Sequence, residues 1–256
     1  SVSGGQRLEA SGLDISGREV RLGETPMAVV AEPEASGYQG YPAAGYADDG
    51  ALLVAWEDRR AGHTRLFHAR REPGGGFAAE RQLNEHNEPP PEEQLEVSLG
   101  SGVMRVVLAS AEPDSVRAIW LDKRNPSSGY AVWGAESADG GRSFGPNGMV
   151  QDELGGAVPQ WHAALAGSGG LYVAAWDDTR EAWGDPAETG DVLMSWIENG
   201  AWSPDLVVPV ASGGGYQGSP AVAVDRDGAV HLLWIDRADL RSPTRLFYAR
   251  AIRTHD

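Results

Sequence analysis

The sequence contains no cysteine and no long apolar segment, and its basic residues are few beside its acidic ones. The absence of cysteine excludes disulfides, zinc sites built from thiolates and thiol nucleophiles. The longest apolar run, residues 51–56, is far shorter than the roughly 20 residues that span a bilayer. With 21 Lys and Arg against 37 Asp and Glu, the formal net charge is −16. We therefore expect neither a nucleic-acid partner nor membrane insertion.

Several signatures of catalytic and cofactor sites are also missing. No Gly-Lys-Ser/Thr segment is present to hold a nucleotide phosphate. The six histidines follow no metal-ligand spacing and lie in no sequence context known for a Ser-His-Asp triad. Helical periodicity is almost absent, while Gly and Pro recur throughout the chain. The sequence therefore predicts an all-β protein.

Four of the nine tryptophans belong to a repeated motif. The pattern Trp-x-Asp-x-Arg recurs at intervals of 56 to 64 residues, and its tryptophans are Trp56, Trp120, Trp176 and Trp234. The last copy places its arginine one residue early. Intervals of this size are typical of a repeated supersecondary unit such as a propeller blade.

Each repeat contains further strand-like segments. A short apolar run precedes each tryptophan, and turns such as Asp48-Asp49-Gly50 precede most of these runs. Residues 65–70 and 245–250 follow the first and last tryptophan and are near copies of each other. We predict one domain, a β-propeller with four blades of four antiparallel strands. The predicted blades are residues 38–85, 95–153, 159–211 and 216–252.

The last predicted blade offers only three strands. A strand-like segment at residues 18–24, near the N-terminus, is therefore predicted to pair with the last blade and close the ring. A fifth blade is the alternative, and a linear stack of sheets is a further one.

One segment resembles a known family. Residues 137–144, Ser-Ala-Asp-Gly-Gly-Arg-Ser-Phe, resemble the Asp-box, Ser-x-Asp-x-Gly-x-Thr-Trp, of sialidase-like (BNR-repeat) propellers. With the tryptophan repeats, the resemblance covers most of residues 38–252. It implies a propeller in which the box is a turn between the third and fourth strands of a blade, and it implies a secreted or periplasmic protein.

The resemblance does not settle whether the protein is an enzyme. Sialidases of this family use three arginines to bind the substrate carboxylate, a tyrosine nucleophile activated by Glu, and an Asp acid/base. The Arg-Ile-Pro segment that carries the first arginine does not occur in this chain. If the protein is an enzyme, glycoside hydrolysis is the reaction class that we expect.

Polar side chains are expected to gather at one rim of the propeller, because the loop that leaves the second strand of a blade and the loop that enters the first open on the same face. The candidate catalytic residues there are Asp58, Asp122, Asp178 and Asp236. The arginines beside them, candidates for ligand binding, are Arg60, Arg124, Arg180 and Arg237. The alternative is structural: each Asp–Arg pair holds its loop, and the tryptophans are core wedges between sheets. A ring of carboxylates around a central channel is a third possibility.

Aromatic and amide side chains occupy the loops that enter the first strands. The candidates are Tyr38, Gln39, Gln160, Trp161, His162, Tyr216 and Gln217. Aromatic rings and amides suit the apolar faces and hydroxyl edges of sugars. Alternatively, Tyr-Gln-Gly is a structural turn, because Gly40 and Gly218 allow a tight bend before a proline.

No cofactor is predicted from a motif. Residues 177–191 form an acidic loop that could hold Ca²⁺, and the central channel is another position for the ion. The spacing of the carboxylates does not match an EF-hand, and the alternative is a solvated acidic loop.

These features leave three functional hypotheses. The first is a secreted propeller that binds a glycan or glycan-bearing partner at the rim of its central cavity. The second is a glycoside hydrolase that uses two rim carboxylates, and the third is a scaffold that binds protein. A hydrolase requires a carboxylate that is not paired with Arg and has a raised pKa. A lectin requires an exposed aromatic ring beside carboxylates that are paired with Arg. A scaffold requires a flat apolar patch. The oligomeric state stays open.

Overall fold

The regular structure of the chain is β throughout the part described. A computed structural model describes residues 9–10, 13–16, 19–22, 27–29, 38–60, 63–85, 102–124, 129–152, 161–180, 189–198, 200–239 and 241–252. No helix occurs in these ranges. The prediction of an all-β protein is confirmed.

The first two sheets have four antiparallel strands each, in chain order. The first sheet consists of β5 (Gln39–Tyr46), β6 (Leu52–Asp58), β7 (Arg65–Arg71) and β8 (Arg81–Gln82). The second consists of β9 (Val103–Glu112), β10 (Ser115–Asp122), β11 (Ala131–Ser137) and β12 (Gly148–Met149). In both sheets the fourth strand is only two residues long and pairs at the middle of the third.

The next two sheets follow the same plan with differences at the outer edge. The third sheet consists of β13 (Trp161–Ser168), β14 (Leu171–Asp178), β15 (Asp191–Glu198), β16 (Ala201–Trp202) and β17 (Leu206–Val207), the last two both pairing with β15. The fourth sheet consists of β18 (Tyr216–Val224), β19 (Val230–Arg237) and β20 (Arg245–Ala251). Four short strands precede the first sheet: β1 (Glu9–Ala10), β2 (Leu13–Ser16), β3 (Glu19–Leu22) and β4 (Met27–Ala28).

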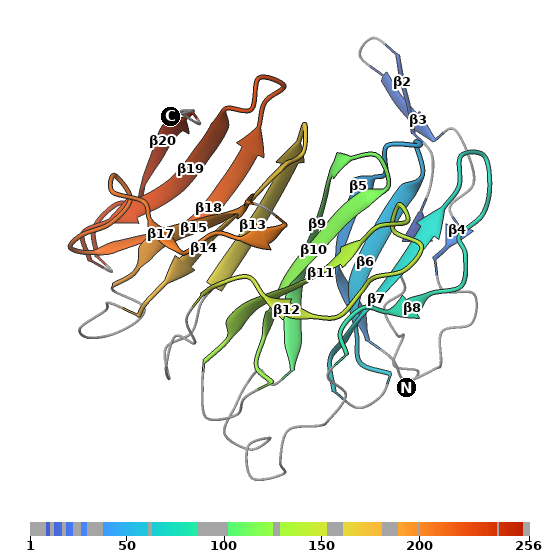
Figure 1. The fold of residues 1–256 in the computed structure, drawn as a ribbon, viewed down its shortest axis with the longest axis horizontal. Coiled ribbons are helices and arrows are strands. Elements are labelled where there is room, and N and C mark those ends of the chain that lie inside the picture. The colour runs from blue at the N-terminus through green and yellow to red at the C-terminus, as the bar shows by residue number, and fades with distance from the viewer. Residues whose placement is uncertain are drawn as a thin grey trace.

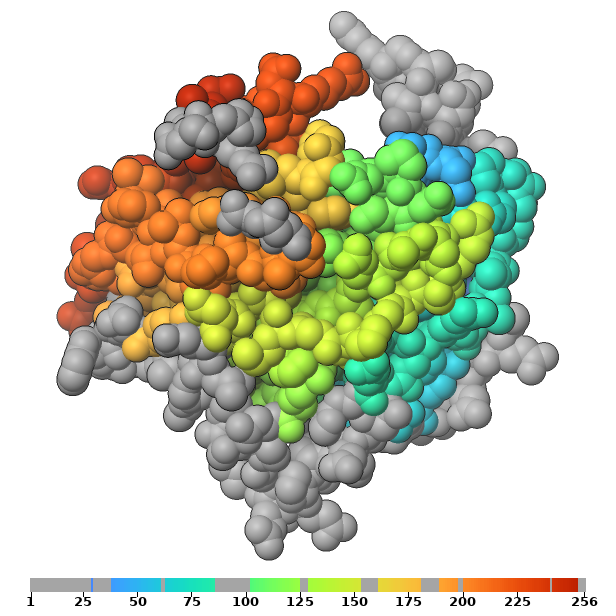
Figure 2. Space-filling model, viewed as in Figure 1, coloured from blue at the N-terminus to red at the C-terminus, as the bar shows by residue number. Residues whose placement is uncertain are grey.

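The four sheets follow one another in chain order across the view of Figure 1, from β5–β8 on the right to β18–β20 on the left. Their first strands lie side by side, with β9 between β5 and β13, and β13 between β9 and β18. The space-filling view shows the residues of the second and third sheets, green to yellow and orange, between those of the first and the fourth (Figure 2). The arrangement gives β5, β9, β13 and β18 a common inner position, and we call them the inner strands.

The predicted closure by the N-terminal strand is wrong. Val20 in β3 pairs with Ile15 in β2, within a hairpin, and not with the fourth sheet. Among the described residues β20 carries no fourth strand, and β5 and β18 do not adjoin as the other inner strands do. The physical reason is chain entropy: β2 and β3 are separated by only two residues, so their pairing closes a very short loop.

The repeated tryptophans fill the space between neighbouring sheets. Trp56, Trp120 and Trp176 have no exposed surface, and Trp234 has almost none. Trp120 clusters with residues of the first sheet and Trp176 with residues of the second, while Trp234 clusters with Ala175 and Val192 of the third. Each of these three indoles therefore packs against the sheet that precedes its own, as expected for core wedges.

Residues 137–144, which we call the Asp-box after their resemblance to that motif, lie at the turn between β11 and β12. Asp139 accepts hydrogen bonds from the backbone N–H of Ser143, at 2.9 Å, and from the hydroxyl of Ser137, at 2.8 Å. Burial opposes ionisation of this carboxyl, but the hydrogen bonds from Ser143 and Ser137 hold its pKa at about 2. Ser137 lies opposite Val116 in the register, so the box is at the other end of its sheet from Asp122.

Candidate binding site between the inner strands

The aspartates of the Trp-x-Asp-x-Arg repeat form a recurring buried cluster at the end of each second strand. The indole Nε1 of Trp120 donates to Asp122 at 3.1 Å, and that of Trp176 donates to Asp178 at 3.1 Å. A longer contact, 3.4 Å, joins Trp56 to Asp58. The spacing of two residues brings indole and carboxylate together because alternate side chains of a strand lie on one face.

An arginine completes each of the first three clusters. Arg60 pairs with Asp58 at 2.5 Å, Arg124 with Asp122 at 2.6 Å and Arg180 with Asp178 at 2.7 Å. The three aspartate side chains have no exposed surface. Although burial favours its neutral form, the hydrogen bonds from Arg60 hold the pKa of Asp58 below its ordinary value. These contacts are the structural arrangement that the sequence left open as an alternative, and in this conformation a substrate cannot reach the three carboxylates.

The fourth copy departs from the pattern. Asp236 is half-buried and accepts a hydrogen bond from Gln217 Nε2 at 2.9 Å. The indole Nε1 of Trp234 is buried without a hydrogen-bond partner among the described residues. Arg237, placed one residue early, stacks over the ring of Tyr216 at 4.9 Å.

The two Tyr-Gln-Gly segments are built alike. Gln39 and Gln217 are buried and donate to the aspartate of their own sheet, Gln39 to Asp58 at 3.2 Å. The ring of Tyr38 lies under the guanidinium of Arg59 at 5.2 Å, as Tyr216 lies under Arg237. The absence of a side chain at Gly40 and Gly218 makes room for the tyrosine hydroxyls. Of the remaining candidates, Trp161 packs against Tyr130 at a ring distance of 5.5 Å, and Gln160 lies outside the described residues.

A bulge interrupts every inner strand at the same place. In each sheet the register shifts so that two residues of the inner strand lie opposite the repeated tryptophan. The first residue of each bulge has a left-handed backbone conformation, and these residues are Tyr41 (φ 47°), Arg105 (φ 60°), His162 (φ 48°) and Ser219 (φ 51°). Left-handed non-glycine residues and bulges are both rare, and both are concentrated at functional sites, where a bulge redirects a side chain.

The four bulges line a single cavity of about 360 Å³. The remaining lining residues are small or apolar: Pro42, Val106, Val107, Ala163 and Pro220. Tyr41, Arg105 and His162 are exposed there, Tyr41 to 52%. The guanidinium of Arg105 lies over the ring of Tyr41 at 5.1 Å. The cavity therefore presents an aromatic ring, a guanidinium, an imidazole and a hydroxyl, from four different sheets.

A buried carboxylate supports the cavity from behind. Asp177 accepts a hydrogen bond from the Tyr216 hydroxyl at 2.6 Å and lies 3.0 Å from His162 Nδ1. The hydrogen bond to Asp177 raises the pKa of His162. Burial, with the charge of Asp177 close by, raises the pKa of the Tyr216 hydroxyl and keeps it protonated. Asp177 thus fixes the imidazole on one side and joins the third sheet to the fourth on the other.

A second carboxylate occupies the same position in the first sheet. Glu57 follows Trp56 as Asp177 follows Trp176, and its Oε1 accepts the backbone N–H of Arg105 at 2.9 Å. Glu57 is almost wholly buried, and burial raises its pKa. It holds the bulge of the second sheet just as Asp177 holds Tyr216 of the fourth.

Solved structures of other proteins resemble this fold, although their sequences differ from this one. The sequence matches no protein-family model, and no curated protein sequence matches it. An α-L-arabinanase of Penicillium chrysogenum, solved with arabinobiose, has a similar structure, with a TM-score of 0.54 and 14% identity over 83% of this chain. An α-L-arabinofuranosidase of Fusarium graminearum gives a TM-score of 0.52 at 13% identity over 83% of the chain. A Hadza microbial sialidase gives 0.52 at 13% identity over 90% of the chain.

The chain has the fold of the sialidase-like β-propellers. It spans 62% of the length of the arabinanase and of the arabinofuranosidase, and 51% of the sialidase. The four sheets are propeller blades in this sense, whereas the number of blades stays a prediction.

Most residues of the cavity between the inner strands were missed in the sequence analysis. Of its four bulge residues, only His162 was among the candidates. Tyr41 and Ser219 directly follow the two Tyr-Gln-Gly segments and precede prolines, so that repeat carried a usable signal. Arg105 and the supporting carboxylates Glu57 and Asp177 have no comparable signal, because their roles depend on contacts between blades.

No metal site is found in the described part of the propeller: no group of three or more His, Asp or Glu side chains is placed to hold an ion there. Residues 181–188 of the acidic loop lie outside the described ranges. None of the described segments forms a helix that could span a membrane.

The contact between His162 and Asp177 predicts a measurable titration. Because Asp177 raises the pKa of His162, the imidazole should titrate above the ordinary value of about 6.5. The stabilisation that it contributes is fully present below that value and is lost as the pH rises through the raised pKa. An NMR titration, with the resonance assigned by His162→Gln, measures this pKa directly. In Asp177→Asn the pKa should fall, and an unchanged value in that variant would contradict the contact.

Proposed function

We propose that the protein binds a carbohydrate in the cavity between the four inner strands. The observation that carries this proposal is the convergence of four strained bulges, one per sheet, on one cavity. The cavity offers the exposed ring of Tyr41, and a sugar ring can stack on the face that the guanidinium of Arg105 does not cover. The guanidinium of Arg105, the imidazole of His162 and the hydroxyl of Ser219 supply hydrogen bonds to hydroxyl groups. A small number of polar groups in a concave site is typical of small-ligand recognition.

The state of the carboxylates favours binding over hydrolysis. A hydrolase of the usual kind needs two carboxyl groups that flank the scissile bond. Asp58, Asp122 and Asp178 are buried in ion pairs, and Asp177 is buried behind His162 and Tyr216. An exposed tyrosine beside paired carboxylates is the combination expected of a lectin.

Glycoside hydrolysis is the second candidate, and it rests on Glu57. This carboxyl group has a raised pKa, as a general acid requires, and no ion pair joins it to an arginine side chain in the described part of the chain. It is nearly inaccessible, however, and its Oε1 already accepts the N–H of Arg105. Hydrolysis by Glu57 would therefore require the bulge at Arg105 to move.

The scaffold hypothesis is supported at a different place. The exposed apolar side chains on the fourth sheet are Leu246, Phe247 and Tyr248, all on β20. None of them lines the cavity between the inner strands. Protein contact at β20 and carbohydrate binding in the cavity are compatible. Secretion or a periplasmic location stays a prediction that accompanies the glycan-binding proposal.

The test uses Tyr41→Ala, with arabinobiose and a glycan array as probes, because one structural neighbour was solved with arabinobiose. Loss of the stacking ring should lower the affinity for the glycan about tenfold or more. Tyr46→Ala is the matched control, since Tyr46 lies on the same strand, is 69% exposed and does not line the cavity. Equal binding by Tyr41→Ala and the unaltered protein, or no retained glycan, would count against the proposal. Release of shorter sugars during the incubation would favour hydrolysis instead.

A further inference from the structure

A second, larger cavity of about 500 Å³ lies between the first sheet and the Asp-box of the second. Its polar lining comes from β7, from the turn after β7, from β8 and from the Asp-box: His68, Arg70, Glu72, Arg81 and Arg142. Phe77 and the small residues around it complete the wall. It shares no lining residue with the cavity between the inner strands, and neither the proposed function nor the comparisons account for it.

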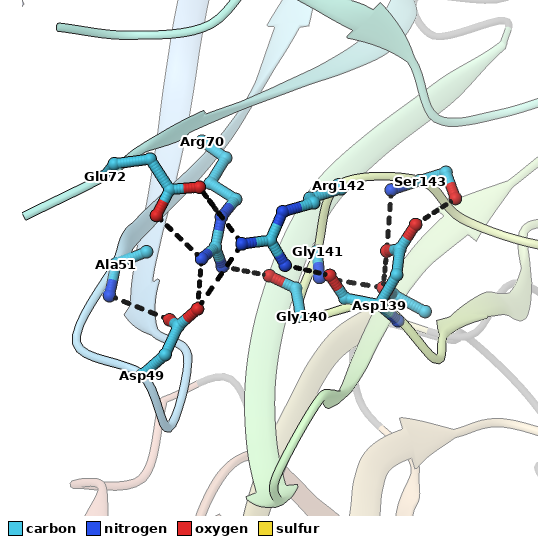
Figure 3. A network of polar contacts seen from close by, with 10 residues as sticks. Asp49, Ala51, Arg70, Glu72, Asp139, Gly140, Gly141, Arg142 and Ser143 are labelled. Carbon is cyan, nitrogen blue, oxygen red and sulfur yellow. Dashed lines mark hydrogen bonds and ion pairs between the residues drawn. The ribbon is translucent and has the colours of Figure 1, made fainter. Parts of the chain in front are cut away.

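Two of the arginines in the cavity wall, Arg70 and Arg142, are neutralised by carboxylates. Arg70 is almost wholly buried, donates to the carbonyl of Gly140 and pairs with Asp49 and, at 2.9 Å, with Glu72 (Figure 3). Arg142, from the Asp-box, approaches the same two carboxylates, Glu72 at 3.2 Å and Asp49 at 3.6 Å (Figure 3). Two guanidinium groups and two carboxylates balance in charge. This network joins the first sheet to the Asp-box and holds the shape of the cavity.

Two polar groups at the cavity, His68 and Arg81, have no hydrogen-bond or ion-pair partner among the described residues. His68 is 5% exposed, packs edge-on against Phe144 at a ring distance of 4.8 Å, and makes no hydrogen bond in the described part of the chain. Burial, with the charge of Arg81 nearby, lowers the pKa of His68 to about 4. The imidazole is therefore neutral at pH 7 and offers one donor and one acceptor nitrogen. Because no described residue hydrogen-bonds to either nitrogen, both are available to a ligand in the cavity that His68 lines.

Arg81 lies beside this histidine. It is directly opposite His68 in the pairing of β7 with β8, so both side chains emerge on the same face of the sheet. Arg81 is exposed, and no carboxylate pairs with it among the described residues. The cavity therefore holds one uncompensated positive charge next to one neutral imidazole.

We propose that this cavity is a second binding site, for a monosaccharide-sized ligand that carries a single carboxylate and hydroxyl groups, such as a sugar acid. Arg81 pairs with the carboxylate, and His68 exchanges a hydrogen bond with a hydroxyl. A charged guanidinium forms its strongest hydrogen bonds with a carboxylate. A doubly charged group such as a phosphate fits less well, because Asp49 and Glu72 stand close by while only one cation is uncompensated.

The experiment is calorimetric titration of the whole chain with D-glucuronate, and with D-glucose as the neutral counterpart, at pH 7. Glucuronate should bind saturably, and glucose should bind at least about tenfold more weakly. Arg81→Gln should weaken the binding of glucuronate about tenfold or more and leave the weak binding of glucose unchanged. Binding should also shift the NMR resonances of the His68 ring, which a general charge effect at the surface would not do.

A second variant fills the cavity without touching the charged groups. A Cβ atom placed on Gly76, which lines the cavity, meets no atom within 4 Å, so Gly76→Leu should fold and obstruct the site. Gly214→Leu is the matched control, because Gly214 is equally unobstructed and lies in the loop before β18. Tyr41→Ala, which disrupts the other cavity, should leave the binding of glucuronate intact, so the two proposals fail separately. Absence of saturable binding, equal binding of glucose, or full binding by Arg81→Gln or Gly76→Leu would each overturn this inference.

Discussion

Replacing Asp178 with alanine is expected to lower the free energy of unfolding by about 3–5 kcal/mol. The side chain has no exposed surface and accepts hydrogen bonds from the indole of Trp176 and from the backbone and guanidinium of Arg180. Its removal leaves the buried indole N–H of Trp176 without its acceptor, and it leaves the largely buried Arg180 with Asp205, at 2.8 Å, as its remaining close carboxylate partner. Urea denaturation followed by tryptophan fluorescence measures the loss, as a lower midpoint at constant slope.

The matched control is the corresponding aspartate of the fourth sheet. Asp236 is half-buried, receives no indole hydrogen bond and accepts one from Gln217. Asp236→Ala should therefore cost about 1 kcal/mol. Similar losses in the two variants would show that the cluster of tryptophan, aspartate and arginine adds nothing to stability. If the protein hydrolyses a glycan, the folded fraction of Asp178→Ala should retain full turnover, and loss of turnover would restore Asp178 as a catalytic candidate.

Replacing Trp120 with alanine is expected to cost about 3–5 kcal/mol, because the substitution opens a large cavity between two sheets. Trp120 has no exposed surface and packs with Leu66 and Leu83 of the first sheet. The substitution also removes the indole hydrogen bond to Asp122. The same denaturation assay measures this loss.

Trp202→Ala is the control that separates the effect of burial between sheets from the effect of losing an aromatic ring. Trp202 is half-buried at the outer edge of the third sheet and lies near the guanidinium of Arg117. Its removal should cost about 1–2 kcal/mol. A loss in Trp120→Ala no greater than this would contradict the role of the repeated tryptophans as wedges between sheets.

The repeat pattern predicted most of the fold, because each repeat forms one sheet and buries its tryptophan at the same position. The tryptophan spacing, the hairpin turns and the alternating strands led to four antiparallel sheets in chain order. The pairing of the ends was predicted wrongly. Leu66 and Leu246 occupy equivalent places in two nearly identical strands, yet Leu66 has no exposed surface and Leu246 is 71% exposed. Their sequences are alike, and only the presence of a neighbouring sheet distinguishes them.

The candidate site was predicted less well than the fold. The position of the aspartates in the repeat identified them as residues at the end of each second strand. It could not show that Asp58, Asp122 and Asp178 are enclosed by the tryptophan and arginine of the same repeat. The bulge residues Tyr41 and Arg105 were missed because a shift of register is decided by how an inner strand accommodates the tryptophan opposite it.

The sequence by itself determined the repeating unit: which residues form the strands of the sheets, which tryptophans are buried, and which aspartate and arginine follow each of these tryptophans. All of these features depend on residues that are close together in the chain or that recur at similar intervals. The tertiary structure alone decided which polar groups remain accessible to a ligand. Tyr41, Arg105, His162 and Ser219 meet because four bulges converge. His68 and Arg81 share a cavity because the Asp-box of the next sheet supplies part of its wall. Such accessibility is a property of packing between sheets, and no local pattern of residues records it.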